Sequence, residues 1–141
     1  MSKLLQRLSD ASRSGVYRAP HARDIQDALQ GSPLRVVQIR IGSAASKQDL
    51  LGRIAGALGF PDWFGGNWDA LEDCLGDLSW SPAAGHVLLF DDARALGADD
   101  RGVLIDILLS VASSWAERGH PFFAVFLDGA PQLPELYRSR R

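Results

Sequence analysis

Three apolar segments of the chain have the pattern of buried strands. Residues 35–41 alternate β-branched and polar positions between a proline and a glycine, which is typical of a strand. Residues 86–90 and 122–127 are almost wholly apolar, as strands covered on both faces are. We therefore predict three buried strands at these positions.

Two helices are predicted between the first two of these strands. Ser46 and Asp49 have the spacing of a capping box, and apolar residues then recur at helical spacing until Gly59. Asn67 is placed to cap a second helix, which ends near Leu78.

The most periodic segment opens at Asp99 or Asp100 and ends at Gly119, and it predicts a third helix. The residues expected to face inward are Val103, Leu104, Ile107, Leu108, Val111 and Trp115. From residue 34 onward the order is strand, two helices, strand, helix, strand. This order predicts an α/β fold with a small parallel sheet joined by right-handed helical crossovers.

The two ends of the chain have weaker patterns. Apolar residues repeat at helical spacing in 4–11 and in 25–29, which predicts two short helices. Neither helix can bury its apolar side alone. We therefore expect residues 1–33 to be a helical N-terminal extension, residues 34–128 to be the domain, and residues 129–141 to be a partly frayed tail.

Composition limits the class of protein. The chain has 141 residues, of which 46% are hydrophobic, and a chain of this size can bury one core without a metal or a disulfide. Cys74 is the single cysteine, so we expect a reducing, cytoplasmic setting. The sequence has neither the apolar stretch of a secretory signal nor a run of about 20 apolar residues.

Charge is distributed unevenly along the chain. The formal net charge is -2, but residues 61–106 contain ten acidic and two basic residues and sum to -8. Binding to nucleic acid requires clustered Lys and Arg, so we expect no direct contact with nucleic acid and no membrane contact. A basic protein is the expected partner.

Acidic residues repeat on one face of the second predicted helix. Asp69, Asp73 and Asp77 lie at i, i+4 and i+8, with Glu72 beside them. Like charges at this spacing destabilise a helix by about 0.2–0.5 kcal/mol per pair, and residues 63–93 contain no Lys or Arg to relieve them. A solvated helix face is the simplest interpretation, but local stability does not explain the pattern.

Aromatic residues next to these carboxylates favour an interface instead. Trp63, Phe64 and Trp68 lie within one loop and one helical turn of the acidic residues, and tryptophan is common at the centre of interfaces. Core packing is the alternative for each of them. We expect Phe64 to be the most core-like of the three.

The segment FPDWFGGNWDALEDCL, residues 60–75, resembles the barstar family of intracellular ribonuclease inhibitors. The corresponding family segment runs aromatic-aromatic-Gly-x-Asn-x-Asp-Ala-Leu-x-Asp-Cys-Leu. The order of strands and helices agrees over about residues 34–127. The resemblance implies a three-stranded parallel sheet packed with helices, whose second core helix and preceding loop block a ribonuclease active site.

The resemblance also implies roles for individual residues. Asp73 would occupy the substrate phosphate site of the ribonuclease, since a carboxylate bonds arginine in the same short, often bidentate way. Asp69 would pair with basic residues nearby. The expected partner-binding residues are Trp63, Gly65, Asn67, Trp68, Asp69, Glu72, Asp73, Gly76 and Asp77. We expect a free monomer that binds its partner one to one.

The chain departs from the family pattern at three places. Glu72 stands where the characterised inhibitor has an aromatic residue, and Gly76 is followed by Asp77 at its glycine-rich helix end. An acidic residue that the inhibitor supplies from its last helix is replaced near Ser113 or Ser114. The target can therefore differ from the best-known ribonuclease, and a different secreted or contact-delivered toxin, with this chain as its immunity protein, is one alternative.

Two further classes of function are weighed against inhibition. Asp91 and Asp92, at the end of a predicted strand, are candidate Mg²⁺ ligands with Asp69 and Asp73, as in a metal-dependent phosphohydrolase. One helix face alone does not converge on a metal ion. The other class is an acidic protein-binding module whose partner is not a ribonuclease.

Nucleophilic catalysis is the weakest alternative. Cys74 with His86 or His120 is the candidate pair, but Cys74 lies on the apolar side of its helix, where cysteine behaves as a small hydrophobic residue. The histidines, His21 included, lack the spacing of metal ligands. We expect no enzymatic activity, no cofactor and no metal.

Overall fold

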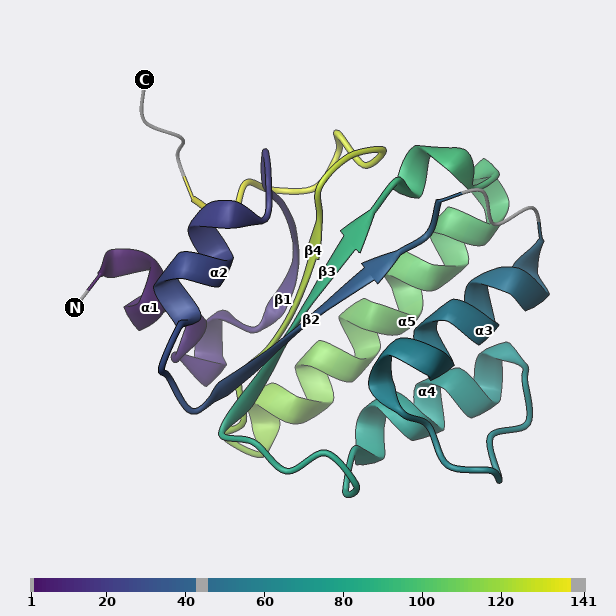
Figure 1. The fold of residues 1–141 in the computed structure, drawn as a ribbon, viewed down its shortest axis with the longest axis horizontal. Coiled ribbons are helices and arrows are strands. Elements are labelled where there is room, and N and C mark those ends of the chain that lie inside the picture. The colour runs from purple at the N-terminus through teal and green to yellow at the C-terminus, as the bar shows by residue number, and fades with distance from the viewer. Residues whose placement is uncertain (1, 43–45, 138–141) are drawn as a thin grey trace.

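The computed structural model describes residues 2–42 and 46–137. Its strands form one parallel sheet in the order β1-β4-β3-β2 (Figure 1). The strands are β1 Gly15–Arg18, β2 Leu34–Arg40, β3 Gly85–Asp91 and β4 Phe122–Phe126. The helices are α1 Lys3–Leu8, α2 Arg23–Leu29, α3 Lys47–Leu58, α4 Trp68–Asp77 and α5 Ala98–Glu117, with short 3-10 turns at η1 Ala11–Arg13 and η2 Ala93–Ala95.

Helices cover both faces of the sheet (Figure 1). The face toward α3, α4 and α5 carries Leu88, Phe90, Phe122, Ala124 and Phe126, and the face toward α1 and α2 carries Val87, Leu89, Phe123 and Val125. Every residue of β4 is buried. The apolar runs of β3 and β4 therefore have the cause that the sequence indicated, which is a cover on each side.

The predicted α/β fold with a parallel sheet and helical packing is confirmed. Ser46 Oγ accepts a hydrogen bond from Asp49 N at 3.2 Å, and α3 ends at Gly59 with a φ of 66°. Asn67 Oδ1 accepts from Ala70 N at 2.8 Å and begins α4. Gly59 and Asn67 therefore fix the two ends of the loop between α3 and α4.

The prediction that Val103 of α5 faces inward is wrong. Val103 is 38% exposed, whereas Leu104, Leu108 and Trp115 are buried. At about 100° per residue, Val103 lies outside the arc that the three buried residues define.

The sheet has four strands where three were expected. β1 lies within the predicted helical extension and pairs with β4 from Gly15 opposite Phe123 to Arg18 opposite Phe126. Ser14 Oγ also accepts a hydrogen bond from Phe122 N at 3.0 Å. Four residues are too short to show a strand period, and their partner is more than 100 residues away in the chain.

The C-terminal segment is fastened to the same strand. Arg18 N donates to Pro134 O at 2.8 Å, Leu136 N donates to Arg18 O at 2.9 Å, and the side chain of Leu136 is fully buried. Residue 1 and residues 138–141, at the ends of the predicted extension and tail, lie outside the described residues. The division of the chain at residues 33 and 128 stays a prediction.

Candidate partner-binding site

Helix α4 separates an apolar side from an acidic face. Leu71, Cys74 and Leu75 are buried, with exposures of 0%. The acidic face consists of the exposed residues Asp69, Glu72, Asp73 and Asp77. Among the residues that the structure describes, none of these four carboxylates forms a salt bridge. The negative charge of this face is therefore uncompensated within the chain.

An aromatic loop, residues 60–66, precedes α4 and presents one tryptophan. Trp63 is 59% exposed, and its ring meets that of Trp80 edge to face at 6.0 Å. Trp80 is itself fixed, because its Nε1 donates to Leu58 O at 3.1 Å and its ring contacts Phe60 at 5.9 Å. The exposed Trp63 therefore stands on a rigid aromatic support.

Trp80 was missed by sequence reasoning. It lies 17 positions after Trp63 in the sequence, beyond the end of α4, and only the fold brings the two rings together. Phe64 packs edge to face on Phe60 at 5.0 Å, and both Phe64 and Trp68 are half-buried against the core. Of the three aromatic residues next to the carboxylates, Trp63 is the one left open to a partner.

A glycine outside the predicted set shapes the loop. Gly66 has a φ of 71°, which side chains rarely adopt, whereas a Cβ placed on Gly65 meets Asn67 Nδ2 at an ordinary 3.6 Å. Gly66 O also accepts a hydrogen bond from Gln48 Nε2 at 3.3 Å, which ties the loop to α3. The loop therefore requires glycine at residue 66, because of its positive φ, and not at residue 65.

Helix α5 contributes to the surface beside the acidic face. Ser110 Oγ donates to Glu72 Oε2 at 3.1 Å. A hollow of about 290 Å³ lies between the two helices, lined by Glu72, Asp73, Gly76, Ser110, Val111 and Ser114. Of the two serines at which the sequence left the alignment open, Ser114 lines this hollow and Ser113 does not.

Two side chains at the C-terminal end of α5, Trp115 in the helix and Arg118 directly after it, hold the last turn of α4. The final carbonyls of a helix have no partner within the helix. Here Trp115 Nε1 donates to Leu75 O at 2.8 Å, and Arg118 Nη2 donates to Gly76 O at 2.9 Å. The Arg118 guanidinium lies 3.7 Å above the Trp115 ring and places a positive charge at the negative end of α4. Sequence reasoning predicted that Trp115 would be buried but not that it would cap α4.

Comparison with known families agrees with this geometry. The model of the family described as Barstar (barnase inhibitor) matches residues 34–127, about two thirds of the chain. The chain belongs to the barstar family. The match runs from β2 through β4 and contains α3, α4, α5 and the aromatic loop, while β1, α1 and α2 lie before it. A comparison with curated proteins finds no match.

Barstar-family proteins are ribonuclease inhibitors, and the catalytic alternatives fit the structure poorly. Cys74 is fully buried, and burial together with the charges of Asp73 and Asp77 raises the pKa of its thiol. Among the described residues no hydrogen bond joins Cys74 to His86 or His120, which bond to each other instead. Cys74 has neither the exposure nor the base that a nucleophile needs.

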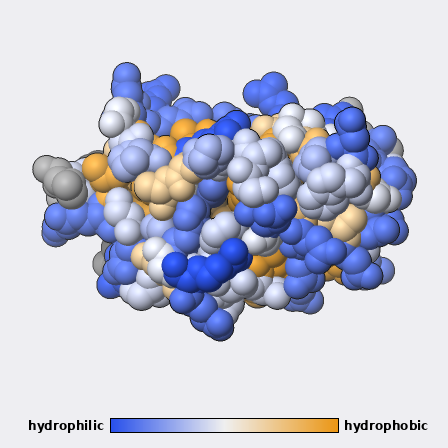
Figure 2. Space-filling view, turned by 90° about the horizontal axis from the view of Figure 1, so that it is seen from below, coloured by the Kyte–Doolittle hydropathy of each residue, from blue (hydrophilic) through white to orange (hydrophobic). Residues whose placement is uncertain are grey.

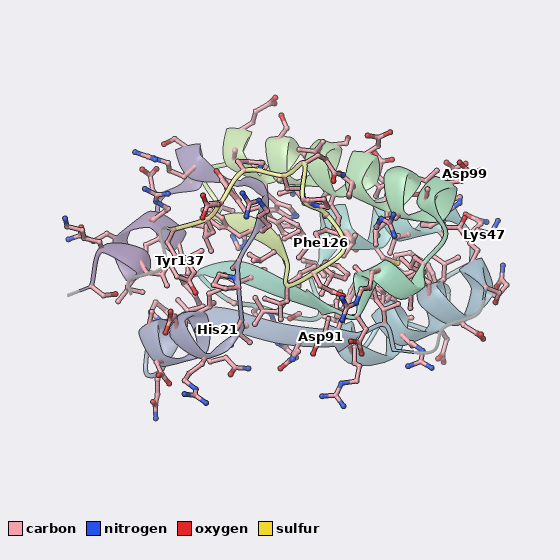
Figure 3. The ribbon with its side chains drawn as sticks, turned by 90° about the horizontal axis from the view of Figure 1, so that it is seen from above. His21, Lys47, Asp91, Asp99, Phe126 and Tyr137 are labelled. Carbon is pink, nitrogen blue, oxygen red and sulfur yellow. The ribbon has the colours of Figure 1, made fainter. Side chains whose placement is uncertain are left out.

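The carboxylates of the phosphohydrolase alternative do not come together. Asp91 closes β3 and accepts a hydrogen bond from Gln38 Nε2 at 3.2 Å, and Figure 3 shows it at the end of that strand. Asp92 follows in the left-handed conformation and is exposed. Within residues 2–42 and 46–137, no three His, Cys, Asp or Glu side chains are grouped as metal ligands.

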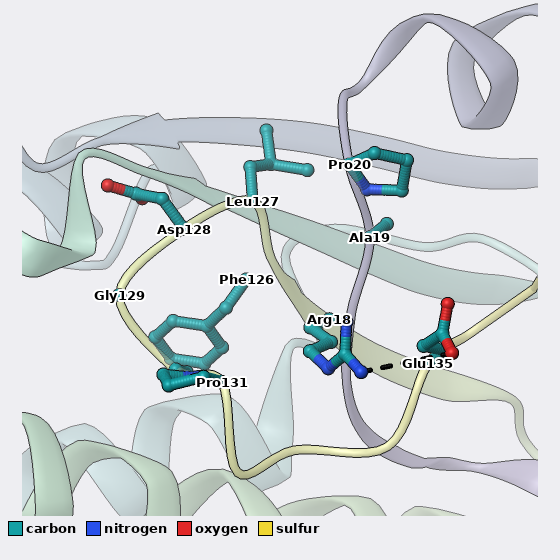
Figure 4. Close-up of a pocket in the computed structure, with 10 residues that line it drawn as sticks. Arg18, Ala19, Pro20, Phe126, Leu127, Asp128, Gly129, Pro131 and Glu135 are labelled. Atoms are coloured by element: carbon teal, nitrogen blue, oxygen red, sulfur yellow. Dashed lines mark ion pairs between the residues drawn. The ribbon is translucent and has the colours of Figure 1, made fainter. Parts of the chain in front are cut away.

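A cavity that the sequence did not indicate lies at the carboxyl ends of β1 and β4. It measures about 430 Å³ and is lined by residues 18–20, 126–131 and 135 (Figure 4). Phe126 and Pro131 face it, and Arg18 Nη2 lies 3.8 Å from Glu135 Oε1 at its rim. None of these residues belongs to α4 or the aromatic loop, so this cavity is separate from the candidate site.

The face seen from below Figure 1 is mostly polar. A view from below Figure 1 shows hydrophilic residues interrupted by small, separate apolar areas (Figure 2). The large hydrophobic side chains that stand out as exposed in the described part of the chain are Trp63, Val103 and Leu109. No helix in that part is long and apolar enough to cross a membrane.

Proposed function

We propose that this protein is a stoichiometric inhibitor that blocks the active site of a basic ribonuclease with α4 and the aromatic loop. The observation that carries the proposal is the acidic face of α4, whose four exposed carboxylates have no salt bridge within the described residues. The supported Trp63 beside them and the membership of the barstar family agree with it.

Asp73 takes the central role. It lies between Asp69 and Asp77 on α4 and lines the hollow next to α5. A carboxylate there offers the arginine and lysine groups of a ribonuclease the same charge-assisted hydrogen bonds that a substrate phosphate does. Asp69 extends this contact toward the N-terminal end of α4, and Trp63 packs against the enzyme beside it.

Glu72 distinguishes this site from that of the characterised inhibitor. The characterised inhibitor has an aromatic residue at this position, whereas Glu72 adds a carboxylate that Ser110 orients. The target ribonuclease then presents a basic or polar group opposite Glu72 and not an apolar one. A toxin ribonuclease with this chain as its immunity protein satisfies that requirement, in a cytoplasmic, one-to-one complex formed from a free monomer.

The experiment is a titration of ribonuclease activity. Barnase, named in the description of the family, is the first enzyme, followed by basic ribonucleases that immobilised protein captures from the producing cells. Loss of RNA cleavage that reaches completion at one inhibitor per enzyme supports the proposal. If none of these enzymes is inhibited, and captured partners lack ribonuclease activity, the acidic-module alternative replaces it.

A second assay separates inhibitor from enzyme. Purified protein is incubated with a phosphodiester substrate and millimolar Mg²⁺, and we expect no hydrolysis because the carboxylates of α4 and β3 do not converge. Metal-dependent hydrolysis that is abolished by Asp91→Asn contradicts the proposal.

A further inference from the structure

Two histidines form a hydrogen-bonded pair at the edge of the sheet where β3 and β4 begin. His86 is 1% exposed, and its Nε2 lies 2.9 Å from Ser81 O. Because a carbonyl oxygen only accepts, Nε2 of His86 carries the hydrogen and Nδ1 is an acceptor. His120 Nε2 lies 3.1 Å from that Nδ1 and therefore donates to it. The hydrogen bond that Nδ1 accepts requires His86 to be neutral, whereas Nε2 can donate to Ser81 O in either protonation state.

The charged groups around the pair are positive. From β2, Arg35 Nη1 donates to Ser81 Oγ at 2.7 Å, and Ser81 Oγ lies 3.3 Å from His86 Nε2. From the end of α5, Arg118 lies over Trp115, the ring on which His120 rests. From β4, the residue opposite His86 is the apolar Phe122.

Neither Arg35 nor Arg118 forms a salt bridge with a carboxylate of residues 2–42 and 46–137. Among the described residues, His21 is the histidine that pairs with an acid, at 3.8 Å from Asp24. Burial, then the charges of His120 and Arg35, lowers the pKa of His86 against the opposing hydrogen bond to Ser81. Burial and Arg118 lower the pKa of His120. The folded structure therefore favours the neutral pair.

The pair is connected to the proposed binding helix by one residue. The rings of His120 and Trp115 lie 4.4 Å apart between centroids. Trp115 caps Leu75 O, and Arg118, stacked on Trp115, caps Gly76 O. The position of the His120 ring therefore bears on both contacts that hold the last turn of α4.

We propose that His86 and His120 form an acid-sensitive latch that holds the last turn of α4 in its binding position while both rings are neutral and releases it on protonation. The proposal rests on the proposed function of α4. The other residues described at this contact do not titrate near neutral pH, since Trp115 does not ionise and Arg118 stays charged.

Protonation acts in two steps. The first proton binds Nδ1 of the more accessible His120, which can still donate from Nε2 to His86. The second binds Nδ1 of His86 and replaces the acceptor by a donor, so that two N–H groups face each other where the nitrogens were 3.1 Å apart. This hydrogen bond breaks, His120 leaves Trp115, and the caps on Leu75 and Gly76 loosen.

The latch is tested first on the free protein. Imidazole ¹⁵N spectra of the wild type are expected to show Nε2–H tautomers for both histidines at pH 7.5 and titration of both below pH 6.5, with His21 as the exposed reference (Figure 3). Amide exchange, corrected for intrinsic rates, is expected to show protection of residues 74–78 falling about tenfold more than that of residues 55–58 between pH 7.5 and 5.5. The latch is overturned if His86 has the Nδ1–H tautomer. It is also overturned if residues 74–78 at the end of α4 and residues 55–58 at the end of α3 lose equal protection.

Variants then assign the effect. His86→Gln keeps polar groups that do not titrate and is expected to remove the acid-dependent loss in α4, while the matched His21→Gln, at an exposed position just before α2, keeps the wild-type profile. If His86→Gln does not fold, the wild-type spectra and exchange data decide the question alone.

Inhibition separates the latch from the proposed function. The inhibition constant for the ribonuclease that the protein blocks is expected to rise at pH 5.5 in the wild type and in His21→Gln, and to stay nearly constant in His86→Gln. If no ribonuclease is inhibited, the proposed function fails while the exchange data still test the latch. If inhibition is equally tight at both pH values, the latch is overturned and the inhibitor proposal stands.

Discussion

Ser110 on α5 donates a hydrogen bond to Glu72 on α4, with 3.1 Å between Oγ and Oε2. This contact joins the two helices on the exposed side of the molecule and orients the carboxylate that stands where the characterised inhibitor has an aromatic residue. A flexible glutamate on a helix surface otherwise has many rotamers, and ordering it on binding has an entropic cost. The hydrogen bond from Ser110 therefore orders the Glu72 side chain before a partner binds.

Replacing Ser110 tests this preparation. Ser110→Ala is expected to weaken inhibition by about 0.5–1.5 kcal/mol through the lost hydrogen bond, with a change in unfolding free energy within about 0.5 kcal/mol because the site is exposed. Ser113→Ala, on the same helix but outside the hollow, is the control. Titration calorimetry and chemical denaturation measure the two quantities. Equal affinities of the two variants mean that Ser110 has no part in binding.

Asp73→Ala is expected to change stability and binding in opposite directions. The substitution removes the repulsion of Asp73 from the like-charged residues at i-4 and i+4. Each of these pairs is unfavourable by about 0.2–0.5 kcal/mol, so the melting temperature stays constant or rises. Affinity falls by about 2–5 kcal/mol, because basic groups of the ribonuclease lose their partner in a buried site. Asp27→Ala, an exposed aspartate on α2, is the control. Unchanged affinity for Asp73→Ala removes this residue from the site.

Association is expected to depend strongly on salt. The segment 61–106 carries a charge of -8, and attraction to a cationic cleft raises the rate of encounter at low ionic strength. Stopped-flow mixing at several salt concentrations should show a steep fall of the association rate and a nearly constant dissociation rate. The double variant Asp69→Asn, Asp73→Asn should reduce the slope, whereas a flat wild-type profile identifies the acidic face as solvated surface only.

Adjacent glycines of the aromatic loop should respond differently to alanine. Gly66→Ala forces a side chain into the left-handed region and is expected to destabilise the fold by about 1–2 kcal/mol. Gly65→Ala introduces a Cβ at an ordinary contact distance and should stay within about 0.5 kcal/mol of the wild type. Denaturant unfolding of the two variants measures the difference. Equal costs contradict the assignment of the strained position to residue 66.

Local sequence signals predicted the parts of the fold that local interactions determine. The caps at Ser46 and Asn67 are side-chain to backbone hydrogen bonds over three residues, and both are present. The apolar runs of β3 and β4 report burial on both faces, which every position in each run shares. The separation of acidic and apolar sides on α4 follows from helical period alone.

Nonlocal contacts explain what the sequence did not predict. β1 is a strand because β4 lies beside it, not because of its own four residues. The support of Trp63 by Trp80 and the cap on Leu75 by Trp115 each join residues from different elements. The hydrogen bond between His86 and His120 joins residues that are 34 positions apart. No spacing rule within one segment encodes such pairs.

The hydrogen bonds that fasten residues 134 and 136 to Arg18 bring the described ends of the chain to one side of the molecule. α1 and Tyr137 lie at the end of the long axis opposite α3, Lys47 and Asp99 (Figures 1 and 3). The described ends at residues 2 and 137 therefore lie away from α4, and a fluorophore, affinity handle or surface linker attached beyond them is expected to leave the acidic face open. The protein can be immobilised by either end for kinetic measurements with its acidic face toward the solution.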